Sequence, residues 1–147
     1  MAERHAQATW HGTLVAGHGQ IDSTGSGAIS GLPVSWKART ETSDGMTSPE
    51  ELLAAANATC YAMAFSHALA GANHPAEQLQ VAATCTFDRK PEGGWKVGSM
   101  HLTVKGRVPG IEADEFSRMA EEAGHACPIS GAIKGNVDIQ ITATLED

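Results

Sequence analysis

Apolar and polar residues alternate along several short stretches of the chain, a pattern typical of β-strands with one buried face. Near the N-terminus, glycine-containing turns separate two such stretches, residues 8–15 and 33–40. In the second stretch Val34 and Trp36 fall on one face and Arg39 falls on the other. We therefore expect Arg39 on the polar side of a strand.

Three longer alternating stretches follow at residues 81–88, 95–108 and 136–145, and a turn signal at residues 91–94 separates the first two. Cys85 lies on the inward side of the first of these stretches. Free cysteine is often a small core residue, so we interpret Cys85 as packing rather than chemistry.

The clearest helix signal begins at Ser48, an N-cap residue followed by Pro49 at the first helical position and Glu51 at the third. Strong helix formers continue from there to Gly71, a natural stop. The run is apolar enough to suggest a membrane span. Polar residues that interrupt it favour the buried helix of a soluble protein instead, and these are Asn57, Thr59, Ser66 and His67. One subunit supplies little cover for such a helix, which indicates a homodimer.

Apolar residues at helical spacing predict a surface helix over residues 111–126, and Pro128 opens a further short helical turn. The order strands, helix, two strands, helix, strand predicts an α+β fold, with an antiparallel sheet packed on a central buried helix and a second helix. No repeat, charge run or long linker divides the 147 residues, so residues 1–147 are expected to form a single domain.

Charge and cysteine content narrow the function classes. Ten Lys and Arg residues against seventeen Asp and Glu residues give a net charge of −7, without a basic cluster. This balance argues against partners such as nucleic acid or an anionic membrane. The N-terminal residues are polar and show no secretory leader, and three cysteines cannot all pair. We therefore expect a cytoplasmic protein without a persistent structural disulfide.

Two of the cysteines are candidates for chemistry. Cys60 lies in the middle of the apolar helix, and Cys127 precedes Pro128 near a helix N-terminus, where partial positive charge favours a thiolate. Thiols in these two contexts suit a peroxide-driven cycle of sulfenic acid and then disulfide. Spacing alone does not show that they meet.

These segments carry a family resemblance that spans essentially the whole chain in order. SPEELLAAANATCYAMAFSHAL and CPISGAIKG, with ATWHGTL, PVSWKART and VPGIEADEF, resemble the OsmC branch of the OsmC/Ohr family of organic hydroperoxide reductases. The resemblance implies an intertwined homodimer of α+β subunits with two active sites at the interface. It also implies an antioxidant enzyme of the oxidative or osmotic stress response, which reduces alkyl and fatty-acid hydroperoxides, and hydrogen peroxide as well, through thiols.

The same resemblance assigns roles to residues. Cys60 aligns with the peroxidatic cysteine, Cys127 with the resolving cysteine, Arg39 with the family arginine and Glu50 with the family glutamate. The cycle it implies needs no metal or organic cofactor, and an external dithiol, such as a lipoylated protein, is expected to reduce the Cys60–Cys127 disulfide. Thr40 is a departure, because a large apolar or aromatic residue commonly follows the arginine. We expect this departure to affect peroxide preference.

Physical chemistry supports the arginine and the glutamate. Burial disfavours the Cys60 thiolate, and a guanidinium can stabilise both that thiolate and the alkoxide that leaves a peroxide. Glu51 caps the helix, so Glu50 is the carboxylate left to hold Arg39 in a bidentate pair. Ten residues of straight helix span about 15 Å, which is too far for Glu50 to act on Cys60 directly. Either the arginine bridges from another direction, or the helix bends, or Glu50 serves the other subunit's site, and we favour this interface arrangement.

Other classes of function remain open. A metal site is disfavoured because the histidines and cysteines lack ligand spacing. A non-catalytic dimeric module could bind an apolar ligand at its interface, with incidental thiols. A monothiol disulfide exchanger could use Cys127-Pro128-Ile129-Ser130, and its activity would not depend on Cys60.

Overall fold

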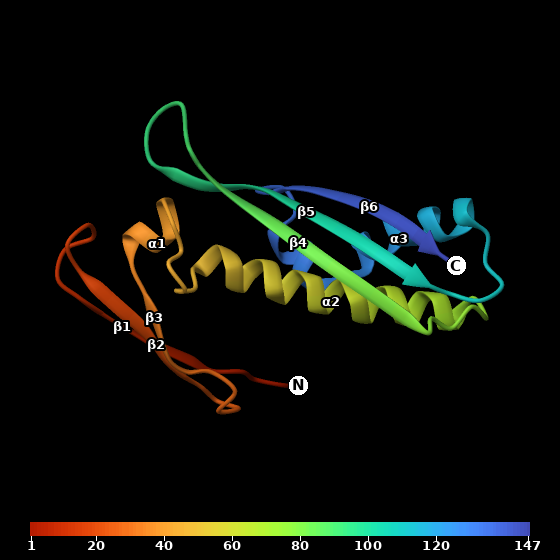
Figure 1. Cartoon of the computed structure of the whole chain (residues 1–147), viewed down its shortest axis with the longest axis horizontal. Helices are drawn as coiled ribbons and strands as arrows, with labels where there is room; N and C mark the ends of the chain where they lie inside the picture. The colour runs from red at the N-terminus through yellow and green to blue at the C-terminus, as the bar shows by residue number, and fades with distance from the viewer. The chain divides into compact units, whose positions relative to one another are not determined.

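A computed structural model describes residues 1–147, which form six strands and four helices (Figure 1). The chain divides into two compact units, an N-terminal unit of Met1–Leu52 and a C-terminal unit of Leu53–Asp147. Each is described by itself. That residues 1–147 act as a single domain stays a prediction.

The N-terminal unit contains a three-stranded antiparallel sheet in the order β1-β2-β3. The bounds of its strands are β1 Ala6–His11, β2 His18–Thr24 and β3 Ser30–Val34. The prediction of strands in this region is confirmed only in part. The first strand ends before Gly12, which adopts a φ of 83°, β3 covers only the start of the second predicted stretch, and β2 was not predicted.

The prediction that Arg39 lies on a strand is wrong. β3 ends at Val34, and Arg39 lies in the short helix α1, Trp36–Thr40. The cause is Ser35, whose Oγ accepts a hydrogen bond of 3.0 Å from the backbone N–H of Ala38 and so caps a helical turn. This local capping bond overrides the alternating pattern of the sequence.

Helix α2 extends from Pro49 to Gly71, as its capping signals predict. The backbone N–H of Glu51 donates to Ser48 Oγ at 3.1 Å, which makes Ser48 the N-cap residue. The Glu51 carboxylate accepts from the Thr47 hydroxyl at 3.4 Å. Glu51 is thus engaged at the start of the helix.

The C-terminal unit contains a second sheet in the order β4-β5-β6, with helices α2, α3 and α4 on one of its faces (Figure 1). The bounds of these elements are β4 Gln78–Arg89, β5 Trp95–Arg107, α3 Ala113–Ala126, α4 Pro128–Ile133 and β6 Asp138–Glu146. The predicted strands and helices of the second half of the chain are all present.

One pairing in this sheet differs from the prediction of an antiparallel sheet. β4 and β5 are antiparallel, whereas β5 and β6 are parallel. α3 and α4 lie between β5 and β6 in the sequence and bring the chain back to the end of the sheet where β5 begins. Parallel pairing of two strands needs such a crossover connection. The α+β fold class itself is confirmed.

The core of the C-terminal unit forms where α2 and α3 cover the inner face of this sheet. The hydroxyl of Tyr61 donates to the backbone oxygen of Ala120 at 2.8 Å, and the rings of Phe65 and Phe116 lie 5.1 Å apart. Cys85 is half-buried and packs against this core, as predicted. The largest fully buried side chains are those of Tyr61, Phe65, Phe116, Leu69, Met100, Leu102 and Val104.

Helix α2 buries only one stripe of its surface within the chain. Its buried residues in the C-terminal unit are Ala54, Asn57, Tyr61, Phe65 and Leu69. The opposite stripe is exposed and consists of small or flexible side chains, with Met63 at 67% exposure. The exposed members of the opposite stripe are Ala55, Ala56, Thr59, Met63, Ser66, His67 and Ala70.

By its length and composition α2 is also apolar enough to cross a membrane. Core helices of soluble proteins pass the same test.

The contact between β5 and α3 can be tested at Gly106. A Cβ atom there would lie 2.4 Å from Cζ of the buried Phe116, so Gly106→Ala should lower the free energy of unfolding by about 1–3 kcal/mol. Gly98→Ala on the same strand is the matched control, because its Cβ would meet nothing closer than 3.8 Å. Urea denaturation measures both, and equal losses for the two variants would contradict this account of the packing.

Candidate functional site

Arg39 and Glu50 form a bidentate ion pair in the N-terminal unit. Nε of Arg39 donates to both carboxylate oxygens of Glu50, at 3.0 and 3.1 Å, and Nη2 donates to Oε1 at 2.7 Å. The Glu50 side chain is 8% exposed and that of Arg39 is 32% exposed. The pairing confirms the expectation that Glu50, rather than Glu51, holds Arg39, and it fixes the plane of the guanidinium.

A hollow of about 260 Å³ lies beside this ion pair in the same unit. Apart from Arg39 and Ser35, its wall is apolar, and the guanidinium of Arg39 lies 5.9 Å from the ring centre of Trp36. The Thr40 hydroxyl donates to the backbone oxygen of Trp36 at 2.9 Å within α1. The residues that complete the wall are Trp10, Leu14, Val34 and Pro49.

Cys60 and Cys127 meet in the C-terminal unit, which sequence spacing alone could not show. Cys60 lies on α2, and Cys127 is the N-cap residue of α4. The two thiols are near enough for each to shift the pKa of the other, and both are free rather than disulfide-bonded. Cys127 is buried and Cys60 is half-buried.

The surroundings shift the pKa values of the two thiols in opposite directions. Burial raises the pKa of the Cys60 thiol, and the Ile129 backbone N–H offsets part of that rise. Burial also opposes ionisation of Cys127, but donors from Ser130, Cys60 and Ile129 outweigh it and lower the pKa of Cys127. Within this unit the thiolate is therefore favoured on Cys127, with the Cys60 thiol as one of its hydrogen-bond donors.

Asn57 is a buried polar residue at this site that the sequence interpretation treated only as a break in the apolar run. Its Nδ2 donates to Ser130 Oγ at 2.9 Å and to Cys127 Sγ at 3.6 Å. Its Oδ1 is buried without a partner, which costs about 1–3 kcal/mol. Asn57 precedes Cys60 by one helical turn, and this spacing was the only available signal.

The four predicted residues thus form two separate pairs. Arg39 and Glu50 belong to the N-terminal unit, and Cys60 and Cys127 belong to the C-terminal unit. α2 is a single helix from Pro49 to Gly71.

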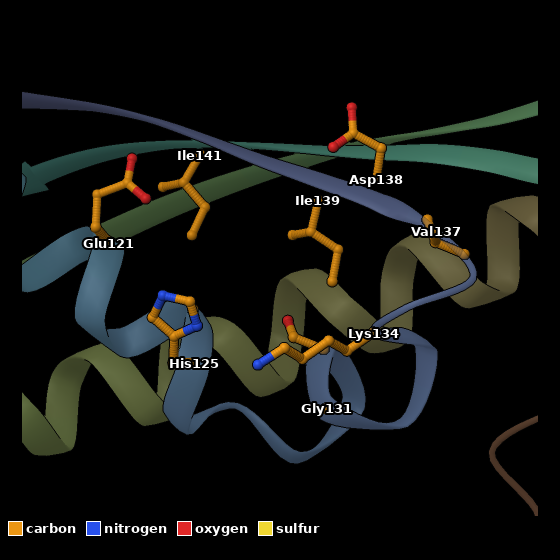
Figure 2. Close-up of a pocket in the computed structure, with 10 residues that line it drawn as sticks. Glu121, His125, Gly131, Lys134, Val137, Asp138, Ile139 and Ile141 are labelled. Atoms are coloured by element: carbon orange, nitrogen blue, oxygen red, sulfur yellow. The ribbon is translucent and has the colours of Figure 1, made fainter.

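A second hollow, of about 210 Å³, lies between α3, α4 and β6 (Figure 2). Lys134 and His125 border it, together with the acidic Glu121 and Asp138, and isoleucines of β6 line it. It presents groups of both charge signs but no cysteine, so it adds no thiol to the candidate site. No group of three or more His, Cys, Asp or Glu side chains is arranged to hold a metal ion.

Sequence comparisons point to one family. The family model described as OsmC-like protein matches residues 42–142. The chain is 32% identical over 136 residues to Peroxiredoxin OsmC of Escherichia coli (strain K12), an alignment that covers 92% of this chain and 93% of that protein. It is 30% identical over 98 residues to the organic hydroperoxide resistance protein of Xanthomonas axonopodis pv. citri (strain 306), covering 65% and 66% of the two chains.

Solved structures share the fold. The crystal structure of the organic hydroperoxide resistance protein OhrB of Bacillus subtilis matches with a TM-score of 0.74 and 23% identity, covering 95% of this chain and 98% of that one. The crystal structure of an organic hydroperoxide resistance protein OsmC from Legionella pneumophila matches with a TM-score of 0.70 and 26% identity, covering 95% and 96%.

The ion pair can be tested against a neighbouring carboxylate. Glu50→Gln should lower the free energy of unfolding by about 1 kcal/mol more than Glu51→Gln, because only Glu50 holds Arg39. Both glutamates lie in the first turn of α2, so the loss of favourable interaction with the helix dipole is matched. Urea denaturation at neutral pH measures the difference, and equal losses would show that the pair contributes nothing measurable.

Proposed function

Because the chain belongs to the OsmC-like protein family, we propose that it is a thiol-dependent peroxidase that reduces organic hydroperoxides to alcohols. The observation that carries the proposal is the proximity of Cys60 and Cys127, two thiols from different helices that shift each other's pKa. A pair in this arrangement can pass from dithiol to disulfide and back. The relatives named peroxiredoxin and organic hydroperoxide resistance protein support a hydroperoxide as the oxidant.

Cys60 is the nucleophile of the first step. Its thiolate attacks the terminal oxygen of the hydroperoxide, an S–O bond forms, and the O–O bond breaks. The departing alkoxide takes up a proton and leaves as the alcohol, while Cys60 is left as a sulfenic acid. Arg39, oriented by Glu50, stabilises the thiolate and the alkoxide.

Two further steps return the enzyme to its starting state. The Cys127 thiolate attacks the sulfur of the Cys60 sulfenic acid, the S–S bond forms, and the hydroxide that leaves is protonated to water. An external dithiol then reduces the disulfide by exchange, and a lipoylated protein is our candidate for it. We place this cycle in the cytoplasm, without a metal or an organic cofactor.

The acidity of the two thiols supports a cation at Cys60. Burial raises the pKa of Cys60, while the negative charge is favoured on Cys127. A guanidinium near Cys60 would shift the charge toward the peroxidatic sulfur. Arg39 is the candidate, since Glu50 already holds its guanidinium in a fixed plane.

The exposed stripe of α2 supports a homodimer. A second copy would cover this stripe of small side chains, which permit close approach of two helices. In such a dimer, Arg39 and Glu50 of one subunit serve the thiols of the other, which avoids the helical separation between Glu50 and Cys60.

The apolar hollow beside Arg39 supports an organic substrate. Its tryptophan and leucine side chains suit the alkyl or aryl group of a hydroperoxide whose O–O bond faces the guanidinium. The same hollow would suit the alternative, a non-catalytic module that binds an apolar ligand.

Cysteine variants test the peroxidase directly. Cys60→Ser should reduce consumption of cumene hydroperoxide with dithiothreitol to the uncatalysed rate, because no sulfenic acid can form. Cys127→Ser should complete one turnover and then stall or over-oxidise, which mass spectrometry detects. Cys85→Ser is the control and should keep its activity.

The wild-type protein should lose two free thiols on oxidation. Peroxidase activity in Cys60→Ser but not in Cys127→Ser would mean that the roles are exchanged. A binding module would consume no peroxide in any variant.

Leu14 tests the substrate class. It lines the hollow and is 56% exposed, so Leu14→Ala should leave the fold intact but remove apolar contact with the substrate. We expect kcat/KM for cumene hydroperoxide to fall about tenfold and that for hydrogen peroxide to stay unchanged. Val15→Ala is the control, since Val15 is exposed and does not line the hollow. An equal effect on both peroxides would show that the hollow is not the substrate site.

A further inference from the structure

Asn57 is the one fully buried amide at the thiol pair. It lies on α2 at 0% exposure, and its carboxamide faces the start of α4. Nδ2 contacts both Ser130 Oγ, at 2.9 Å, and Cys127 Sγ, at 3.6 Å, whereas Oδ1 has no partner. An apolar side chain at this position would leave no buried acceptor unpaired, so the amide is not explained by packing.

The direction of the hydrogen bonds is fixed by chemistry. Ser130 Oγ accepts from Asn57, which leaves the single hydroxyl proton of Ser130 free to be donated, and the Ser130 side chain is one of the groups that lower the pKa of Cys127. The Ser130 backbone N–H also donates to Cys127 Sγ, at 3.5 Å. Asn57, Ser130 and Cys127 thus form a chain in which every proton points toward the sulfur.

The reverse orientation of the amide is disfavoured. It would place Oδ1 beside the Cys127 sulfur, where an oxygen repels a thiolate, and it would draw the Ser130 hydroxyl proton away from the cysteine. Only the NH₂ group, with two hydrogens, can serve both Ser130 Oγ and a thiolate. The titratable groups that act on Cys127 are Cys60 and Tyr61, both of α2.

We propose that Asn57 is a positioning residue for the resolving step: acting directly and through Ser130, it holds the Cys127 sulfur as a hydrogen-bonded thiolate that faces Cys60. This inference rests on the proposed peroxidase cycle for its role, but not for its geometry. The step it serves is the attack of Cys127 on the sulfur of the Cys60 sulfenic acid, in which the S–S bond forms and hydroxide leaves to become water.

Thiolate titration tests the inference without any peroxide. In a Cys60→Ser, Cys85→Ser background, Cys127 is the sole thiol, and the serine at position 60 keeps a hydroxyl donor. Asn57→Ala should raise the pKa of Cys127 so that its thiolate fraction falls about tenfold at pH values below that pKa, as followed by ultraviolet absorbance. Gln80→Ala is the control, because it removes an exposed amide on β4 that belongs neither to the thiol pair nor to the exposed stripe of α2, and it should change nothing.

A double-mutant cycle separates the chain of donors from a general loosening of the fold. Ser130→Ala should raise the pKa of Cys127 as well, and adding Asn57→Ala should shift it by less than the sum of the two single effects, because the amide acts partly through the serine. If Asn57→Ala does not fold, Ser130→Ala alone still tests the other end of the chain. An unchanged titration of Cys127 in the folded variants overturns the inference.

The kinetic consequence is measured in the otherwise native protein. After one equivalent of cumene hydroperoxide, dimedone labelling should show that the Cys60 sulfenic acid of Asn57→Ala persists about tenfold longer than that of Gln80→Ala, in proportion to the lost thiolate. Equal lifetimes would overturn the role in resolution. Absence of any sulfenic acid in the unmutated protein would instead overturn the proposed peroxidase, and the titration result would stand.

Discussion

The burial of one stripe of α2 is the constraint on which the rest of the structure depends. Tyr61, Phe65 and Leu69 fill the space between the helix and the sheet, and the Tyr61 hydroxyl is bonded to the backbone of α3. These contacts fix the rotation of α2 about its axis. As a result Asn57 faces α4 and Cys60 meets Cys127, while the opposite stripe of small residues is left to solvent in the single chain.

The thiol pair is best regarded as one acid with two sites. Because each thiol shifts the pKa of the other, the first proton lost belongs to the pair, and the groups around it decide which sulfur carries the charge. The backbone and side-chain donors around Cys127 favour that sulfur in the resting chain. A cation at Cys60 would therefore shift the balance between the two sulfurs toward Cys60.

Much of this arrangement could be predicted from the sequence, where local signals agree with the tertiary structure. Ser48 and Gly71 marked α2, and alternation marked β4, β5 and β6. The pairing of Glu50 with Arg39 followed from the engagement of Glu51 at the helix start. These features depend on neighbouring residues, which a sequence displays directly.

The parts that could not be predicted depend on competition or on distance along the chain. The alternation of apolar and polar residues continues past Ser35, but Ser35 caps a helical turn there, so Arg39 lies in a helix. The parallel pairing of β6 depends on where the crossover through α3 and α4 ends. Asn57 looked like an interruption of an apolar run, and its role depends on partners seventy and seventy-three residues away.

That crossover also sets an order of events during folding. β4 and β5 form a local hairpin, whereas β6 must close a long loop before it can pair with β5. Cys127 and Ser130 lie within this loop, so one of the two thiols is carried by the connection that pairs β6 with β5. The thiol pair is therefore a property of the folded C-terminal unit, and an unfolded chain carries Cys60 and Cys127 as two ordinary, unconnected thiols.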